Sequence, residues 1–236
     1  MSATAPAGLP LELILRRAGA VLITREGRPV VSHFGSAAAE LAVCVRRVGL
    51  VERSDLGTVG LGAPEAQLSA LMTRLVGADV SPGGLVCGGG AWWCGVTPEE
   101  VMVVCDQRTS ARLLGALHAA AARHVAVRDH SSELAAIGLL GRHTGKVLAA
   151  LGVYGQSRDP RQAAPFARGS IDGIAISWLL ESDRHALALV PRERAGEVWL
   201  GLERAGRPFG ITCVGHEAAC RYALMERLRP ATPAYL

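Results

Sequence analysis

The feature that most constrains the fold is an order of segments that occurs twice along the chain. A short apolar strand over Leu56–Leu61 leads into a helix that begins near Pro64, and Leu134–Leu151 shows the same strand-then-helix pattern. Each copy continues with two hairpin strands and a second helix, at a spacing of roughly 80 residues, far longer than the repeats of solenoid proteins. This order predicts an α+β chain made of two tandem ferredoxin-like (split β-α-β) halves.

Periodicity assigns the remaining segments of both copies. The first copy has strands over Gly90–Gly95 and Glu100–Cys105 and a helix over Gln107–Arg123; the second has strands over Ile174–Leu180 and His185–Val190 and a helix over Pro191–Arg204. The alternative is coincidence among segments rich in Ala and Leu. Because the hairpins match as well as the helices, the sequence favours a duplication.

Further elements are expected outside the two copies. They are a helix over Leu11–Ala20, a hairpin pairing Val21–Ile23 with Pro29–Val31, a helix over Ala37–Gly49 with Ser36 as N-cap and Gly49 as its stop, and a final helix over Glu217–Leu228. These segments predict an N-terminal extension (1–32), a first half (33–128), a second half (129–229) and a tail (230–236). Arg128–Ser132 is interpreted as the linker, and the polar stretch Val153–Gly169 as a mobile lid.

Composition limits the class of protein. Half of the residues are hydrophobic and 19% are charged, which is typical of a globular chain. No apolar run reaches about 18 residues and the first 30 positions carry several charges, so we expect no membrane span and no secretory signal. The net charge of +4 is scattered and aromatic residues are 4%, which argues against a nucleic-acid-binding surface.

The six cysteines predict neither a metal site nor disulfides. They include no C-x-x-C pair and no Cys/His spacing of a zinc site. Cys44, Cys105 and Cys213 lie in apolar segments, where a free cysteine behaves as a small hydrophobic residue. We therefore expect reduced thiols and a cytoplasmic protein.

Candidate functional residues cluster around the first hairpin. Trp92 and Trp93 are suited to stacking on a flat ring, but consecutive residues of a strand point to opposite faces, so one of them is expected in the core. Cys94 is a possible nucleophile, although nothing marks its thiol as activated. Asp106 is the carboxylate at the end of a site-facing strand, and it is equally placed to cap the helix that follows. Glu181 and Asp183 are interpreted as a solvated turn.

Taken together, residues 33–228 resemble the folate-binding domain of the aminomethyltransferase family, which includes the glycine cleavage T-protein and the sarcosine oxidases. The resemblance rests on the order and spacing of Val48–Leu71, the hairpin after Gly83–Gly90, the strand-Pro-helix Leu187–Arg204 and the closing G-I-T-C-V-G-H-E-A segment. It implies two ferredoxin-like halves around a central cavity that holds tetrahydrofolate. The family's C-terminal barrel-like domain is expected to be absent, as in the sarcosine oxidase gamma subunit.

The sequence departs from the family where the family keeps its carboxylate. The T-protein pattern G-G-x-x-D-D falls on Gly89-Gly90-Ala91-Trp92-Trp93-Cys94, and the T-protein asparagine at the end of the next strand falls on Cys105, followed by Asp106. The resemblance therefore leaves Asp106 as the catalytic candidate. It implies the following contacts to tetrahydrofolate or a one-carbon derivative: Leu56, Trp92, Trp93, Cys94, Cys105 and Trp178.

Two functions of different classes follow from the resemblance. One is a folate-dependent one-carbon transferase acting on a small amine. The other is a non-catalytic subunit, similar to sarcosine oxidase gamma, that binds a larger oxidase or forms an oligomer. A third, folate binding in iron–sulfur or tRNA maturation, ranks last because Val153-Tyr154-Gly155-Gln156 matches the K-G-C-x-x-G-Q-E segment of that branch poorly.

Overall fold

The computed structural model describes residues 10–25, 27–53, 55–120, 124–155 and 164–228. Two stretches of the chain have the same order of elements. The first comprises β4 (Leu56–Gly62), α3 (Glu65–Val76), β5 (Leu85–Gly88), β6 (Ala91–Thr97), β7 (Glu100–Asp106), α4 (Gln107–Ala120) and β8 (Ala126–Asp129). The second comprises β9 (Leu134–Leu140), α5 (Thr144–Ala150), β10 (Phe166–Ile171), β11 (Ile174–Ser182), β12 (His185–Pro191), α6 (Ala195–Gly206) and β13 (Ile211–Cys213).

Elements at the two ends of the chain flank these stretches. They are α1 (Glu12–Arg17), β1 (Val21–Arg25), β2 (Arg28–His33), α2 (Ala37–Arg46), β3 (Val48–Glu52) and α7 (His216–Arg227), with short 3-10 turns η2 (Arg192–Arg194) and η3 (Arg207–Phe209) around α6. The predicted N-terminal hairpin is confirmed, since Ile23 pairs with Val30. The Ser36 cap is also confirmed, because its hydroxyl accepts a hydrogen bond from the Ala39 amide.

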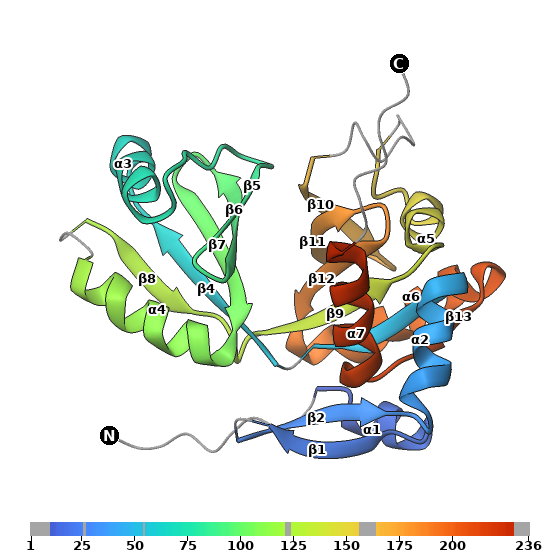
Figure 1. Cartoon of the computed structure of the whole chain (residues 1–236). Helices are drawn as coiled ribbons and strands as arrows, with labels where there is room; N and C mark the ends of the chain where they lie inside the picture. Colours follow the sequence, from blue (N-terminus) through green and yellow to red (C-terminus); the bar gives the residue numbers. More distant parts are fainter. Residues whose placement is uncertain (1–9, 26, 54, 121–123, 156–163, 229–236) are drawn as a thin grey trace.

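The strands form a hairpin and two larger sheets, which appear as two lobes in Figure 1. The five-stranded sheet has the order β5-β6-β7-β4-β8, and the six-stranded sheet has the order β10-β11-β12-β9-β3-β13. β13 runs parallel to β3, whereas the other pairs are antiparallel, so the larger sheet is mixed. The α+β class predicted from the sequence is confirmed.

The prediction that Gly49 ends a helix is wrong. Helix α2 ends at Arg46, and Gly49 lies inside β3, between Leu140 of β9 and Thr212 of β13. A Cβ atom at Gly49 would lie 2.7 Å from Val214 Cγ2 and 2.8 Å from Cys44 Sγ. The glycine is therefore needed for the close approach of α2 and the β13–α7 connection, not for a turn.

Two segments interpreted as loops contain strands. The end of the predicted lid, from Phe166, belongs to β10, which pairs with β11, while residues 156–163 lie outside the described part. The predicted linker begins inside β8, where Arg128 pairs with Gly60 of β4. The predicted tail (230–236) lies outside the described residues, as do residues 1–9 of the predicted N-terminal extension and the predicted end of helix α4 at Arg123.

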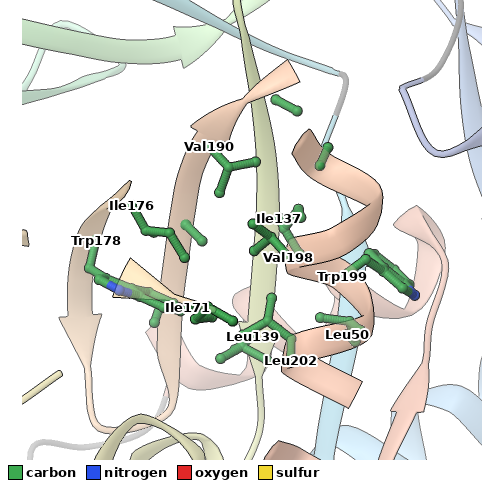
Figure 2. Packing of buried hydrophobic residues seen from close by; sticks show 14 of the residues in the cluster. Leu50, Ile137, Leu139, Ile171, Ile176, Trp178, Val190, Val198, Trp199 and Leu202 are labelled. Atoms are coloured by element: carbon green, nitrogen blue, oxygen red, sulfur yellow. The ribbon is translucent and has the colours of Figure 1, made fainter. Parts of the chain in front are cut away.

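Four buried clusters show how the layers pack. One face of the first sheet packs on α3 and α4, through residues such as Val103 and Leu71. One face of the second sheet packs on α5 and α6; Figure 2 shows Ile137 and Leu139 of β9 facing Val198 and Leu202 of α6. A third cluster joins the two sheets, and a fourth joins β3 to α2 and α7. The layers therefore follow the order helices, sheet, sheet, helices.

Candidate functional site

The two sheets meet through an apolar cluster that contains some of the predicted site residues. Leu56, Cys94 and Val104 of the first sheet pack against Leu179, Leu187 and Leu189 of the second. Because side chains alternate along a strand, every second residue of β6 and β7 reaches this seam. We refer to this contact layer as the inter-sheet cluster. The structure thus places Leu56 and Cys94, two of the predicted cofactor contacts, between the sheets.

A pocket lies next to Trp92, at the periphery of the inter-sheet cluster. Trp92 is half-buried and packs against the inter-sheet cluster. The pocket, called here the Trp92 pocket, has a volume of about 500 Å³, and it is lined by Leu85, Cys87, Gly88, Gly90, Ala91, Trp92, Glu181 and Arg227. This volume lies within the range of small-molecule sites. Its walls come from β5, β6, β11 and the end of α7.

Two charged residues complete the Trp92 pocket, and sequence reasoning missed both. Glu181 Oε2 lies 2.5 Å from Nδ1 of His185, which holds the carboxylate in place at the end of β11. Arg227 comes from the last turn of α7. The sequence interpretation puts Glu181 in a solvated turn. It assigns Arg227 only to a short basic cluster, because the last helix aligns poorly with the family and no occupant of its contact positions can be singled out.

Three of the predicted contacts lie in the core clusters on the opposite faces of the sheets. Trp93 is 3% exposed and packs with α3 and α4, where its indole Nε1 donates to the Gly88 carbonyl over 3.0 Å. Cys105 lies in the same cluster. Trp178 is 1% exposed and belongs to the core cluster of the second sheet, where Figure 2 shows it beside Ile171 and Ile176. The strand alternation that brings Trp92 to the pocket therefore takes Trp93 into the core.

The thiols near the site are unsuited to nucleophilic attack at neutral pH. All six cysteines are free. Burial raises the pKa of the Cys94 thiol, and burial together with the Asp106 charge raises the pKa of Cys105 to about 11. Burial and the nearby Glu181 charge also raise the pKa of Cys87 in the Trp92 pocket. The thiolate is the reactive form of cysteine, so these residues offer no activated nucleophile.

Asp106 caps helix α4. Its Oδ1 accepts a hydrogen bond from the Thr109 amide over 2.8 Å, and its Oδ2 accepts one from the Thr109 hydroxyl over 2.8 Å. Although burial opposes ionisation, these hydrogen bonds hold the pKa of Asp106 below its ordinary value. The cap interpretation of Asp106 is therefore confirmed, and the carboxylate is engaged away from the Trp92 pocket.

A second pocket lies beside this cap. It has a volume of about 310 Å³, and it is lined by Arg25, Arg28, Asp55, Asp106, Gln107, Arg108, Thr109, Arg112 and His216; we call it the arginine pocket. At its wall, Arg53 Nε and Nη2 donate to the two carboxylate oxygens of Asp55 over 2.8 and 2.9 Å. Burial opposes ionisation of Asp55, but the Arg53 guanidinium holds its pKa below the ordinary value. No sequence motif indicates that these distant segments meet.

Within the described ranges, no group of three or more His, Cys, Asp or Glu residues is arranged to hold a metal ion. No helix among those described is long and apolar enough to cross a membrane.

Comparison with known proteins identifies the fold. No family model and no curated protein sequence matches the chain. The structure is similar to the glycine cleavage system aminomethyltransferase T from Bartonella henselae, with a TM-score of 0.76 and 15% identity over 95% of this chain. This chain spans 63% of the length of that T-protein chain.

A second similar structure is smaller. It is a chain of the heterotetrameric sarcosine oxidase from Corynebacterium sp. U-96, solved with pyrrole 2-carboxylate, with a TM-score of 0.57 and 20% identity. The match covers 75% of this chain and 93% of that one. The chain therefore has the folate-binding-domain fold that the T-protein and sarcosine oxidase share.

Proposed function

We propose that the chain binds tetrahydrofolate, or a one-carbon derivative of it, in the Trp92 pocket and transfers a one-carbon unit to or from a small amine. The observation that carries this proposal is the half-buried Trp92 ring, which lines a pocket of about 500 Å³ together with one carboxylate and one guanidinium. A flat heteroaromatic ring suits stacking on tryptophan. The T-protein fold of the chain supports the choice of a pterin over other flat ligands.

The residues of the pocket fit such a ligand. Trp92 provides a stacking surface, and Leu56 and Cys94 extend it into the inter-sheet cluster. Glu181, oriented by His185, can accept hydrogen bonds from the ring's amino and N–H groups, and Arg227 can donate to its carbonyl. Tetrahydrofolate supplies the nitrogen that carries the one-carbon unit. In this proposal Glu181 is the carboxylate nearest the reacting atoms, and Asp106 is left to its capping role.

Calorimetric titration with tetrahydrofolate tests the ring site, because its readout does not depend on tryptophan fluorescence. We expect the wild-type chain to bind with micromolar affinity. Stacking on an aromatic side chain contributes roughly 1–3 kcal/mol, so Trp92→Ala should weaken binding about tenfold or more. Glu181→Gln should weaken it by a smaller factor. Trp178→Phe, in the core cluster of the second sheet, is the matched control and should bind like wild type.

Activity is tested separately from binding. The wild-type chain should form methylene-tetrahydrofolate from tetrahydrofolate and the N-hydroxymethyl derivatives of a panel of small amines, whose one-carbon unit is already at the oxidation level of formaldehyde, with release of the free amine and water. It should also catalyse the reverse transfer, and Glu181→Gln should be slower in both directions. Binding without turnover on any amine would contradict the transferase and leave a folate-binding protein. Absence of binding by the wild-type chain would reject the proposal altogether.

A specific observation favours a second function, that of a subunit in a larger oxidase. The chain covers 93% of one chain of the heterotetrameric sarcosine oxidase. In addition, Leu224, Met225 and Leu228 are 59%, 45% and 75% exposed on one side of α7, next to the pocket residue Arg227. An exposed group of large apolar side chains is typical of a protein contact.

Reconstitution tests this alternative. The chain would be expressed together with candidate amine oxidase subunits from its own genome, and the mass of the purified assembly would be measured. A stoichiometric complex that Leu224→Glu disrupts, with Leu13→Glu on α1 as an equally exposed control, would support the subunit. A chain that stays monomeric with every candidate would contradict it.

We also propose that the two sheets descend from one duplicated unit with the cofactor cavity between them, each with the predicted ferredoxin-like order. The support is the identical order of strands and helices in the two stretches. A cytoplasmic location is likewise a proposal, supported by six free thiols, because cysteines of oxidising compartments are commonly paired.

A further inference from the structure

The arginine pocket has an excess of positive charge that its own carboxylates do not neutralise. Arg25 and Arg28 come from the hairpin β1–β2, and Arg108 and Arg112 from the first turns of α4. The pocket contains two carboxylates, and both are engaged: Asp55 pairs with Arg53, and Asp106 caps α4. Within the described residues, the side chains of Arg28 and Arg112 make no hydrogen bond or ion pair, although the charge of Arg112 helps to lower the pKa of Asp106.

His216 gives a second, independent indication of a ligand. Its side chain is 9% exposed and lines the same pocket. Its Nδ1 atom is buried and has no hydrogen-bond partner among the described residues, since the nearest carboxylate oxygen, Asp55 Oδ2, is 3.9 Å away. The other ring nitrogen contacts Arg25 and the Cys220 thiol. A buried polar atom without a partner is costly, and a small polar ligand or a slight ring movement on binding would satisfy it.

The geometry also sets the size and charge of the ligand. The lining arginines come from two different elements, the hairpin β1–β2 on one side of the chain order and helix α4 on the other. Each guanidinium can bind a carboxylate through two parallel hydrogen bonds. The start of α4 adds the positive end of a helix dipole. A volume of about 310 Å³ exceeds the needs of one inorganic anion and suits a short dicarboxylate with one carboxylate at each of these two groups of arginines.

We propose that the arginine pocket is a binding site for a short dicarboxylate of the size of glutarate. The dicarboxylate has two possible sources: a free metabolite, or the glutamyl end of a ligand whose ring occupies the Trp92 pocket. The two pockets are neighbours, because a Cβ atom at Gly90 of the Trp92 pocket would lie 3.8 Å from Thr109 Oγ1 of the arginine pocket. Only the second source rests on the proposed function.

Calorimetry with glutarate as the probe tests the site. We expect the wild-type chain to bind glutarate with a dissociation constant on the order of 1 mM or tighter. Hydrogen bonds to charged groups are worth about 1.5–3 kcal/mol, so Arg28→Gln and Arg112→Gln should each weaken binding about tenfold or more. Arg46→Gln on the exposed end of α2 removes the same charge elsewhere and should change the affinity less than about twofold.

A second readout follows His216 directly. Addition of glutarate should shift the NMR signals of the His216 imidazole in the wild-type chain, and Arg28→Gln should require more glutarate for the same shift. An absent glutarate response, or an equal loss in Arg46→Gln and Arg28→Gln, would overturn the proposal, because the second result would reflect net charge alone.

Competition separates the two sources. If glutarate competes with tetrahydrofolate and Arg112→Gln weakens both, the site holds the glutamyl end of the folate. If both ligands bind at once, the site takes a free dicarboxylate. Glutarate has no ring, so Trp92→Ala should leave its affinity unchanged. Failure of the Trp92 pocket to bind a pterin can therefore be distinguished from failure of the dicarboxylate site.

Discussion

At the residue scale, Asp106 shows how a candidate catalytic residue can be assigned by its hydrogen bonds. The carboxylate accepts two hydrogen bonds from Thr109 at the start of α4. Loss of such a cap costs about 1 kcal/mol, within a range of about 0.5–2. We expect Asp106→Ala to lower the free energy of unfolding by about that amount at pH 7, and Asp106→Asn, whose amide oxygen still caps, to lower it less. Urea denaturation measures both.

The pH dependence of the same variants gives a second check on the cap. The pKa of Asp106 is lowered in the folded state, so the ionised carboxylate stabilises the fold above its unfolded pKa of about 3.9. This contribution is lost as the pH falls through the folded-state pKa. The gap between wild type and Asp106→Ala should therefore narrow at low pH. A large loss of turnover in Asp106→Asn at unchanged stability would instead mark Asp106 as catalytic.

Single residues differ in how far the sequence alone could place them. Side-chain alternation along a strand predicts that Trp92 and Trp93 point to opposite faces, and the position of Asp106 just before a helix predicts a cap. Both predictions depend on neighbours within a few positions. The pocket residues Glu181 and Arg227 reach Trp92 from β11 and α7, far along the chain. No local pattern encodes such a meeting, because it depends on how the two sheets and the last helix pack.

At the scale of elements, the turn from β9 into α5 docks on the end of α2 through Gly141. Its φ angle is +129°, and a Cβ atom there would lie 2.5 Å from the Cys44 carbonyl oxygen and 2.6 Å from that of Arg47. Backbone atoms cannot move aside as a flexible side chain can. We expect Gly141→Ala to destabilise the protein by about 3 kcal/mol or more, at the upper end of single substitutions, in thermal and urea unfolding.

Gly152 is the matched control for this turn. It also has a positive φ angle, +70°, but nothing lies within 4 Å of its would-be Cβ atom. Gly152→Ala should therefore cost only the left-handed backbone penalty of about 1–2 kcal/mol. Equal losses in the two variants would show that the approach of α2 to this turn contributes nothing.

Periodicity predicts an element well where the residues of that element determine its secondary structure. It predicts an element poorly where a partner that is distant in the sequence determines it. The hairpin β6–β7 and helix α3 follow from alternation and helical spacing. The first two residues of strand β3, Val48 and Gly49, are predicted as the end of a helix, because five residues with one glycine carry little periodic signal. Its extended state is fixed by β9 on one side and β13 on the other, two segments that are remote in sequence.

At the scale of the whole molecule, β3 makes the two predicted halves depend on each other. It precedes the first stretch in the chain, but it pairs in the sheet of the second, where Leu50 lies opposite Leu139 and Cys213. The predicted second half, 129–229, does not contain it. Without β3, the edge of β9 and the three-residue β13 would lose their partners, and an unpaired strand edge favours aggregation.

We therefore expect residues 129–236 expressed alone to lack a cooperative unfolding transition. The same segment joined by a flexible linker to residues 10–53, which supply α2 and β3, should regain one, measured by circular dichroism in urea and by size-exclusion chromatography. Both proteins expose the face of the inter-sheet cluster, so the comparison measures what residues 10–53 contribute, including α1 and the hairpin β1–β2 as well as α2 and β3. In the joined protein, Leu50→Asp should abolish the transition, because it places a charge in the core beside Leu139. If the segment alone unfolds cooperatively at the same midpoint as the joined protein, the second sheet is an independent unit, and the predicted division of the chain is also its division in folding.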